Sequence, residues 1–494
     1  MGPHSGAKIA AGKLGEGPME TRFTGLASDS REVKPGYLFA ALPGTKVDGA
    51  EFMEDAVCRG AIAVLGLPEV APAAAALGVR FIADENPRKA LARYAASFYA
   101  SQPEVVAAVT GTNGKTSITV FLREIWTTLG KRAASMGTIG VVTPESVITL
   151  HHTTPGPIEL HGILADLKRS GIDHLAVEAS SHGLDQFRLD GTDIAAVGFT
   201  NITRDHMDYH PTFAAYLACK LRLFTELARD GAVAVVNADT DHAEDFIAAA
   251  KARGLRLLTV GEKGESLKLL ACAPHGDGQS LKIAYGAVTH TVELPLAGAF
   301  QASNALVAAG FAIGLGEDAA AVFAALAKLK GAPGRLEKVA YAKSGAPIYV
   351  DYAHTDDALV NVLTALRPHT KGNLAVVFGC GGDRDKGKRP LMGAAAAKFA
   401  DRVIVTDDNP RSESAPTIRR EILAGCPNAQ EIGDRAEAIH AGIAALGAGD
   451  VLVIAGKGHE SGQTVGNVVH PFSDRDEAIK AAALLGGHAA EGAP

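Results

Sequence analysis

A glycine-rich loop at residues 110–117 carries the residues best suited to bind a nucleotide. It reads Thr-Gly-Thr-Asn-Gly-Lys-Thr-Ser and lies between an apolar run and a segment of helical spacing, 118–129. Glycines let the backbone approach phosphate oxygens, helix-start amides point toward them, and Lys115 adds a positive charge. Thr116 is placed to ligate Mg²⁺. The predicted nucleotide-binding residues of the loop are Gly111, Thr112, Asn113, Gly114, Lys115, Thr116 and Ser117.

The loop departs from the general phosphate-loop pattern at one position. Val109 stands where that pattern has its first glycine. An ordinary glycine-rich turn between a strand and a helix is therefore the alternative. The Gly-Lys-Thr sequence in this context favours nucleotide binding.

Two further segments place polar side chains directly after apolar runs. Glu178 follows the run 175–177 and precedes Ser181 and His182, and the run 197–200 leads into a segment that contains His206. In parallel sheets, binding and catalytic residues lie at the carboxyl ends of the strands. Mg²⁺ prefers oxygen ligands and keeps several waters, so acidic side chains are expected near the loop. Each segment alone could be a capped turn with a structural histidine, but their common position favours a site.

The elements that must position these residues are of the α/β class. Apolar runs alternate with Ala-rich stretches of helical spacing from residue 105 onward. A second series of runs, at 348–350, 374–378, 403–405 and 451–454, predicts another doubly wound sheet. Turn formers at 102–103 and 331–334 separate the series.

This pattern predicts three domains. We expect a smaller N-terminal α/β domain at 1–102, a central ATP-binding domain with a parallel sheet of the P-loop ATPase type at 103–333, and a C-terminal Rossmann-like doubly wound domain at 334–494. The length of 494 residues agrees with this number, at roughly 150 residues per domain.

Composition excludes several classes of protein. Lys and Arg number 48 and Asp and Glu 55, so the net charge of −7 gives no general attraction to nucleic acid or anionic lipid. The five cysteines are scattered without C-x-x-C pairs, which fits a reducing compartment. No apolar run reaches the roughly 18 residues of a membrane span. We therefore expect a cytoplasmic protein with neither a nucleic-acid nor a membrane partner.

Taken together, these motifs resemble those of the ATP-dependent Mur ligases of peptidoglycan synthesis. The resemblance runs from Asp-Ser-Arg at 29–31 to Phe-Ser-Asp at 472–474. The family form of the phosphate loop has Ala or Val ahead of it, which accounts for Val109. The resemblance implies ATP as cosubstrate, Mg²⁺ as cofactor, a cytoplasmic location and a monomer.

Carried over by position, the resemblance assigns roles in the first two domains. Lys115 would act on the phosphates, and the magnesium ligands would be Thr116, Glu178, His206 and Lys220. Lys220 matches the family's carbamylated lysine, and carbamylation would convert an ammonium into an anionic oxygen donor that suits a cation. From the residues alone, Lys220 would pass as a helix-surface charge.

The remaining implied contacts concern the nucleotide substrates. The uridine nucleotide would meet the residues Ser28, Ser30 and Arg31. The muramoyl-peptide would meet Thr153, Thr154, Ser181, Gln186 and Arg188. Asn304 and Arg335 resemble the family's further ATP contacts.

The C-terminal domain is expected to hold the incoming amino acid. meso-Diaminopimelate carries a carboxylate and an ammonium at its far end, whereas lysine has only the ammonium. A guanidinium can bind the extra carboxylate through two parallel hydrogen bonds. The sequence Asp-Asn-Pro-Arg at 408–411 resembles the family's diaminopimelate signature. The residues implied to bind diaminopimelate are Arg389, Asp408, Asn409, Pro410, Arg411, Gly456 and Glu460. For Arg411, a surface ion pair is the alternative.

The function implied by the resemblance is the ATP-dependent addition of meso-diaminopimelate to UDP-N-acetylmuramoyl-L-alanyl-D-glutamate through an acyl phosphate. A sister ligase that adds L-lysine is an alternative that Arg411 disfavours. Folylpolyglutamate synthetase is disfavoured by the segment 29–31 and by Thr-Thr-Pro at 153–155. A nucleotide-binding scaffold without ligase activity is the third alternative. It is disfavoured because the metal, lysine and acceptor-domain motifs are all present together.

Overall fold

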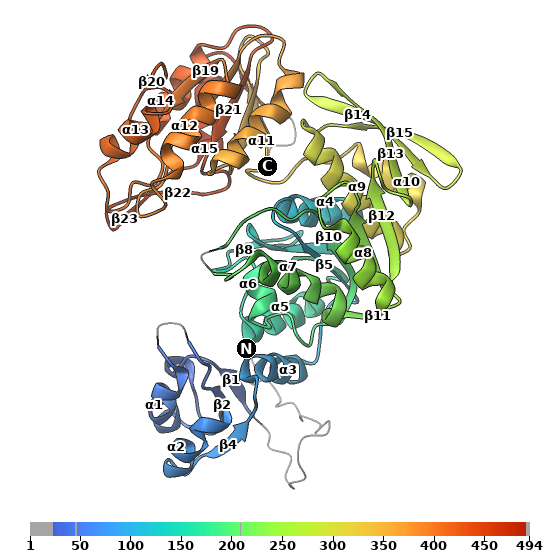
Figure 1. Ribbon diagram of the computed structural model, residues 1–494, viewed down its shortest axis with the longest axis vertical. Coiled ribbons are helices and arrows are strands. Elements are labelled where there is room, and N and C mark those ends of the chain that lie inside the picture. The colour runs from blue at the N-terminus through green and yellow to red at the C-terminus, as the bar shows by residue number, and fades with distance from the viewer. Residues whose placement is uncertain (1–22, 45–46, 208, 491–494) are drawn as a thin grey trace. The chain divides into compact units, whose positions relative to one another are not determined.

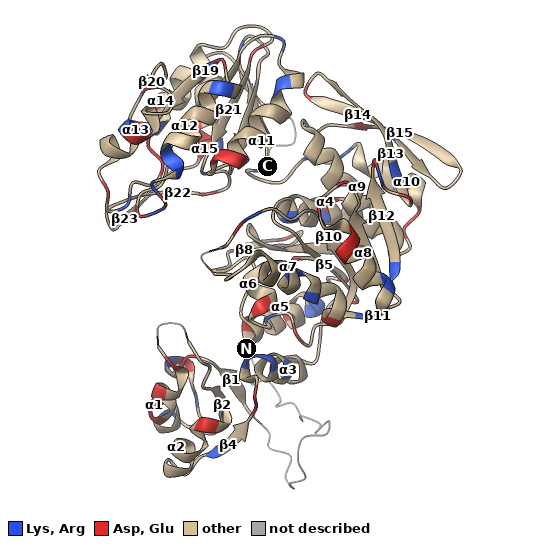
Figure 2. Ribbon diagram, viewed as in Figure 1, with Lys and Arg blue, Asp and Glu red and all other residues tan. Residues whose placement is uncertain are grey.

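The computed structural model describes residues 23–44, 47–207 and 209–490. The chain is α/β, with parallel-rich sheets in an N-terminal, a central and a C-terminal domain (Figure 1). Contacts between residues separate it into two compact units, Met1–Thr259 with Gly314–Gly316, and Val260–Ile313 with Glu317–Pro494. Lys and Arg are interspersed with Asp and Glu along the ribbon (Figure 2). In the described ranges, no helix is both long and apolar enough to cross a membrane.

The N-terminal domain is a parallel sheet of four strands in the order β1-β2-β3-β4. Its longest helix, α3, begins after Asn86, whose side chain accepts a hydrogen bond from the Lys89 N–H and so caps the first turn. The elements are β1 Gly25–Ala27, β2 Tyr37–Ala40, α1 Met53–Cys58, β3 Ala61–Gly66, α2 Ala71–Ala76, β4 Arg80–Ala83 and α3 Pro87–Tyr99, with short 3₁₀ turns at Ser30–Glu32, Gly49–Phe52 and Pro68–Val70.

The central domain is organised around a parallel sheet. Strand β5 lies between β9 and β10, so the ends of those two strands flank the loop that follows β5. The strands belong to a sheet of eleven, with the order β15-β14-β13-β12-β11-β10-β5-β9-β6-β7-β8. The elements to residue 261 are β5 Val105–Thr110, α4 Lys115–Thr128, β6 Ala133–Gly137, β7 Gly140–Val142, β8 Val147–Ile148, α5 Pro157–Arg169, β9 His174–Glu178, α6 Ser181–Asp185, β10 Ile194–Phe199, α7 Phe213–Arg222, a π-helical turn Leu223–Leu227, β11 Ala228–Asn237, α8 Ala243–Ala252 and β12 Arg256–Gly261.

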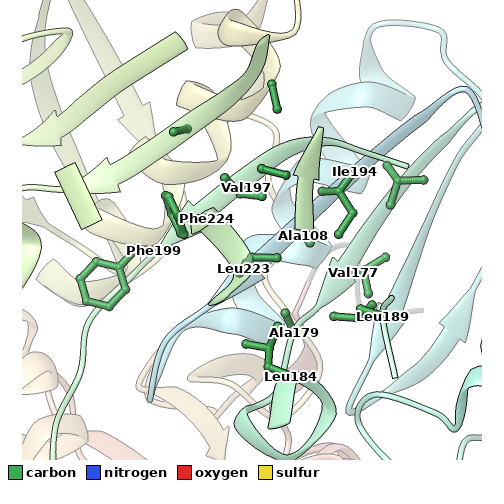
Figure 3. Packing of buried hydrophobic residues seen from close by; sticks show 14 of the residues in the cluster. Ala108, Val177, Ala179, Leu184, Leu189, Ile194, Val197, Phe199, Leu223 and Phe224 are labelled. Carbon is green, nitrogen blue, oxygen red and sulfur yellow. The ribbon is translucent and has the colours of Figure 1, made fainter. Parts of the chain in front are cut away.

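One hydrophobic cluster fixes these strands and the helices beside them. Figure 3 shows side chains from β10 (Val197, Phe199) packed with Leu223 and Phe224 of the π-helical turn. Phe199 is fully buried and stacks on the ring of Phe246 in α8, with 3.7 Å between ring centroids. The strands read as continuous apolar runs because both faces of a parallel sheet are covered.

The second unit begins with an antiparallel extension that the sequence pattern did not predict. β13 pairs with β14 and β14 with β15 in antiparallel register. The extension comprises β13 Leu267–His275, β14 Gly278–Tyr285, β15 Val288–Leu294, α9 Ala299–Gly314 and α10 Ala319–Leu326.

The C-terminal domain is a doubly wound sheet in the order β20-β19-β18-β21-β17-β16-β24. Within β18, Val376 and Phe378 join one core cluster, whereas Ala375 and Val377 join another, so the sheet is covered on both faces. The elements are β16 Glu337–Tyr341, β17 Pro347–Asp351, α11 Asp356–Leu366, a 3₁₀ turn Arg367–His369, β18 Leu374–Phe378, α12 Lys388–Phe399, β19 Arg402–Val405, α13 Ala415–Leu423, β20 Gln430–Glu431, α14 Arg435–Ala444, β21 Val451–Ala455, β22 Gly462–Val465, β23 Val468–Pro471, α15 Asp474–Leu484 and β24 His488–Ala489.

The predicted fold class is confirmed. The apolar runs at 105–109, 175–177, 194–197, 348–350, 374–378, 403–405 and 451–454 all lie in strands, and the predicted helix 118–129 corresponds to α4. The predicted domain boundaries fall outside the sheets, which span residues 25–83, 105–294 and 337–489.

Candidate active site

The glycine-rich loop joins β5 to the start of α4. Gly111 has φ +153°, and a Cβ at this position would come within 1.9 Å of the Thr200 hydroxyl oxygen. Gly114 has φ +87° and forms the N-cap of α4. Only glycine fits both positions, since one has no room for a side chain and the other is left-handed. The first turn of α4 therefore presents backbone N–H groups without intrahelical acceptors, as an anion site requires.

The segment after β10 fixes the shape of this loop. The Thr112 N–H donates to the Asn201 carbonyl (2.9 Å), and the Asn113 N–H donates to Asn201 Oδ1 (3.0 Å). The Thr200 hydroxyl donates to the Asn113 carbonyl at 2.6 Å. Thr200 and Asn201 thus fix the backbone of the loop between its two glycines. The sequence pattern did not reveal this role.

Two lysines converge on one carbonyl of the loop. Lys115 Nζ and Lys220 Nζ both donate to the Gly111 carbonyl, at 2.9 and 2.8 Å. Lys220, on α7, is only 1% exposed, so it is not the surface charge that its residue type favours. Burial and the nearby Lys115 charge hold the pKa of the Lys220 amine well below its usual range.

Glu178 is the last residue of β9 and is almost fully buried. Thr138 donates to it twice, from its backbone N–H (2.8 Å) and from its hydroxyl (3.2 Å). A Cβ on Gly137 would come within 2.1 Å of Glu178 Oε1, so a larger residue there would displace the carboxylate. Thr138 was missed in the sequence, where its only signal is its place after an apolar run, at the end of the strand beside β9.

The predicted muramoyl-peptide contacts gather beside Glu178. The hydroxyls of Thr138 and Thr153 lie 3.2 Å apart, and the Thr154 hydroxyl donates to the Glu178 carbonyl at 2.8 Å. Arg188 Nη1 donates to the Thr154 carbonyl at 2.6 Å.

Two further predicted contacts lie in the same region. Gln186 Oε1 accepts a hydrogen bond from Arg188 Nη2 at 2.7 Å, so these two predicted contacts are linked directly. Within the described residues, the Ser181 hydroxyl is one of a few buried side-chain polar groups without a hydrogen-bond partner.

His206 adopts a left-handed backbone conformation, with φ +54°. Its ring lies edge-on to His182, with 5.0 Å between centroids, and its side chain is 46% exposed. Across the described ranges, no group of three or more His, Cys, Asp or Glu side chains is placed to hold a metal by itself. Thr116, Glu178 and His206 offer a hydroxyl, a carboxylate and an imidazole, and Mg²⁺ keeps several waters, so it would need few ligands from the protein.

The residues predicted to contact the uridine nucleotide follow β1. Arg31 is an exposed guanidinium paired with Asp29, with Nη2 2.5 Å from Oδ2, and this hydrogen bonding lowers the pKa of Asp29 to about 2. Ser28 is exposed and Ser30 is buried. The pairing orients the Arg31 guanidinium and leaves it accessible.

The structure links the two other predicted ATP contacts to each other. Asn304 Nδ2 donates to Gln301 Oε1 at 3.2 Å, and Gln301 Nε2 donates to the Arg335 carbonyl at 3.0 Å. The Arg335 guanidinium lies over the Tyr352 ring, 4.5 Å from its centroid. Gln301 was not identified from the sequence.

In the C-terminal domain, most predicted amino-acid contacts come together at the ends of β19 and β21. Asn409 Nδ2 donates to Glu460 Oε2 at 3.0 Å. A Cβ on Gly456 would lie 2.6 Å from Asp408 Oδ2, so the backbone passes close to that carboxylate. Arg411, which follows Pro410, has φ +50° and donates from Nη1 to the Gly382 carbonyl at 2.8 Å.

Arg389 is placed differently from the expectation. Its side chain has no exposed surface, and its guanidinium pairs with Glu413 (2.9 Å) and Glu421 (2.6 Å). These partners occupy Nη1 and Nη2, two of the donors that would otherwise bind a ligand carboxylate. The exposed Arg384 lies near Arg411, since a Cβ on Gly381 would lie 2.8 Å from Arg411 Nη1 and 3.8 Å from Arg384 Cγ.

A buried ion pair supports the same strand ends. Arg435 and Asp474 are fully buried and bonded through two contacts of 2.6 and 2.7 Å. Arg435 also donates to the carbonyls of Asp407 (3.2 Å) and Ala455 (3.0 Å), the residues directly before Asp408 and Gly456. Sequence reasoning missed this pair, whose members lie 39 positions apart.

Family models and relatives cover most of the chain. Three family models match the chain: "Mur ligase family, catalytic domain" at residues 22–99, "Mur ligase middle domain" at 109–312, and "Mur ligase, glutamate ligase domain" at 334–458. A relative from Bradyrhizobium diazoefficiens is 56% identical over 93% of this chain and 94% of its own length. One from Caulobacter vibrioides is 54% identical, with 93% and 95% covered. Both are named UDP-N-acetylmuramoyl-L-alanyl-D-glutamate–2,6-diaminopimelate ligase.

Solved structures give the same result. A structure of a UDP-N-acetylmuramoyl-L-alanyl-D-glutamate–2,6-diaminopimelate ligase matches with a TM-score of 0.72 and 36% identity over 94% of this chain and 95% of that chain. A MurF ligase from Thermotoga maritima in complex with ADP matches with a TM-score of 0.58 and 20% identity over 93% and 96% of the two chains, and shares the fold. On its sequence, its fold and the clustering of its site residues, this chain belongs to the Mur ligase family.

Proposed function

We propose that this protein is an ATP-dependent ligase that joins meso-2,6-diaminopimelate to the D-glutamate of UDP-N-acetylmuramoyl-L-alanyl-D-glutamate. Relatives that are 50–56% identical over most of the chain carry the name of that activity. The structural observation that carries the proposal is the Arg411 guanidinium held in one loop with Asn409, whose amide donates to Glu460. The reaction belongs to cytoplasmic peptidoglycan precursor synthesis, and the cytoplasmic location and monomeric state stay predictions.

The central domain supplies the ATP chemistry of the proposal. Lys115 and the N–H groups at the start of α4 bind phosphate oxygens and neutralise their charge. Thr116, Glu178 and His206 would hold Mg²⁺, which supplies further charge neutralisation when bound. The buried Glu178 carboxylate is oriented by Thr138, so it is fixed before a ligand arrives.

Lys220 is proposed to function as a carbamate. Its amine is buried at the Gly111 carbonyl, and its lowered pKa favours the neutral amine. A neutral amine can add to CO₂, forming an N–C bond and releasing one proton. The product is anionic and donates oxygen, so it suits a cation better than an ammonium does.

The amide forms in two steps. The D-glutamate carboxylate attacks the γ-phosphorus of ATP, which forms an acyl phosphate and expels ADP. An amine of diaminopimelate then attacks the acyl carbon, phosphate leaves, and the amine proton passes to solvent. The protein contributes alignment and charge neutralisation, as in other phosphoryl transfers. Thr153, Thr154, Ser181, Gln186 and Arg188 are proposed to hold the muramoyl-peptide.

The C-terminal domain is proposed to select the amine. Arg411 and Arg384 would grip the far carboxylate of diaminopimelate, and Glu460 would accept hydrogen bonds from its far ammonium. Arg384 replaces Arg389 in this role, because Arg389 is paired with two carboxylates. L-Lysine lacks the far carboxylate and would leave both guanidinium groups without a ligand carboxylate to bind.

Phosphate release tests the proposal directly. The enzyme is assayed with ATP, UDP-N-acetylmuramoyl-L-alanyl-D-glutamate and either diaminopimelate or L-lysine. Release with diaminopimelate alone is expected. Preference for lysine would favour the sister ligase, and no release with either amine would favour a nucleotide-binding scaffold. Lys115→Ala should abolish ADP formation while retaining uridine-nucleotide binding, and retained turnover would contradict the role of Lys115.

A further inference from the structure

Lys457 is a buried lysine between two residues of the proposed amino-acid site. Its side chain has no exposed surface. Its Nζ donates to Asn409 Oδ1 and to Glu460 Oε2, both at 3.1 Å, and lies 3.9 Å from Asp408 Oδ1. A buried ammonium with these partners holds two carboxylates and an amide in one arrangement.

This arrangement determines which way the Asn409 amide faces. Its Oδ1 accepts from Lys457 Nζ and from the Thr464 N–H, the latter at 2.9 Å. Both partners are donors, so the oxygen must face them and the NH₂ group must face Glu460. One N–H then bonds to Glu460 Oε2, and an amide NH₂ has a second N–H to donate.

The hairpin of β22 and β23 fixes the neighbouring Arg411 by its backbone. The Arg411 N–H donates to the Thr464 carbonyl (3.0 Å), and its carbonyl accepts from the Gly466 N–H (2.7 Å). Gln463 Nε2 donates to the Asp408 carbonyl at 2.7 Å. Left-handed φ is unfavourable for arginine, so these external bonds hold a conformation that the residue would otherwise leave.

We propose that Lys457 and the β22–β23 hairpin are positioning elements that set the selectivity for the incoming amino acid. The inference rests on the proposed function, in which Asn409, Arg411 and Glu460 bind the far end of diaminopimelate. With Lys457 in place, the Asn409 N–H and the Arg411 guanidinium face a carboxylate. Without it, the Thr464 N–H is the remaining described donor to the Asn409 oxygen, and an amide that turned over would present its oxygen to that carboxylate, so the two would repel.

The test compares Lys457→Met with wild type in steady-state kinetics. The KM for diaminopimelate should rise by roughly 10- to 100-fold, the scale for loss of charged hydrogen bonds. The KM values for ATP and for the uridine nucleotide should stay within about twofold, because the residues proposed to bind those substrates lie outside this network. Lys398→Met, an exposed lysine on α12, is the matched control and should change none of the three. An unchanged KM for diaminopimelate, or an equal rise in all three, would overturn the role of Lys457.

A double-mutant cycle separates positioning from general destabilisation. If Lys457 acts through Asn409, the double variant Lys457→Met, Asn409→Ala should be about as impaired toward diaminopimelate as Asn409→Ala alone. Additive losses would overturn the inference. An Asn409→Ala variant with normal KM for diaminopimelate would instead refute the proposed function.

Two further variants keep the inference testable if Lys457→Met does not fold. Lys457→Gln retains a donor without the charge and should give a smaller rise in the same KM. Gln463→Ala removes only the hairpin's side-chain bond to the Asp408 carbonyl, and it should also raise the KM for diaminopimelate selectively. Failure of both Lys457 variants to fold would make the lysine structural and overturn its role, and a normal KM in Gln463→Ala would overturn that of the hairpin.

Discussion

Replacement of Arg411 by methionine should convert a selective ligase into an unselective one. The change removes the guanidinium but keeps a long side chain. Residue 411 has φ +50°, and methionine and arginine meet the same steric cost there, so the backbone strain is unchanged. Among the described residues, the side-chain hydrogen bond lost is that from Nη1 to the Gly382 carbonyl.

The magnitude follows from the donors that Arg411 offers. With Nη1 bonded to Gly382, the other guanidinium N–H groups can pair with a carboxylate. Hydrogen bonds to charged groups contribute about 1.5–3 kcal/mol, so kcat/KM for diaminopimelate should fall roughly 10- to 150-fold. L-Lysine has no far carboxylate, and its kcat/KM should change by less than about threefold.

Parallel phosphate-release assays with the two amines measure this change. The ratio of kcat/KM values for diaminopimelate and lysine cancels errors in enzyme concentration and any loss of ATP binding. Arg420→Met, an exposed arginine on α13, is the matched control and should leave the ratio unchanged. Equal losses with both amines, or no loss with diaminopimelate, would refute the role of Arg411.

Three other perturbations test the structure elsewhere. Arg435→Met leaves Asp474 buried without its ion-pair partner and should destabilise the C-terminal domain by about 3–5 kcal/mol. The double variant Arg435→Met, Asp474→Leu should recover most of that loss, because it leaves no buried unpaired charge. Hydrogen exchange of the α14 and α15 amides measures the stability of both variants. Thr138→Val removes one of the two hydrogen bonds to Glu178 and should raise the Mg²⁺ concentration for half-maximal activity roughly tenfold, whereas Thr138→Ser should behave as wild type in the same titration. Burial lowers the pKa of His161 below its unfolded value near 6.5, so below pH 6.5 the unfolded chain binds more protons than the folded one. The free energy of unfolding should therefore fall by at most about 1.4 kcal/mol per pH unit as the pH drops from 6.5 toward the folded pKa. Urea unfolding measures this dependence, and the His161→Gln variant should lack it.

The sequence determined several strands of the central and C-terminal sheets and the loop that joins β5 to α4. Strands β5, β9 and β10 are apolar runs whose period is visible locally, and the phosphate loop depends on glycines whose backbone needs are local too. The positions of Glu178 at the end of β9 and of Asp408 to Arg411 after β19 could likewise be predicted without coordinates, because parallel strands end at one edge of a sheet.

Only the tertiary structure decided how individual side chains are used. Lys220 and Arg389 are of residue types that usually lie at the surface, yet both are buried. Lys220 lies against the phosphate loop, and Arg389 lies between the carboxylates of Glu413 and Glu421. Thr138 and Lys457 were given no role from the sequence, since partners that define their roles, Glu178 and Asn409, lie 40 and 48 positions away along the chain. The antiparallel strands β13 to β15 were missed as well. Burial and long-range hydrogen bonds depend on which distant segments come into contact in the folded chain. Local periodicity and composition do not predict those contacts.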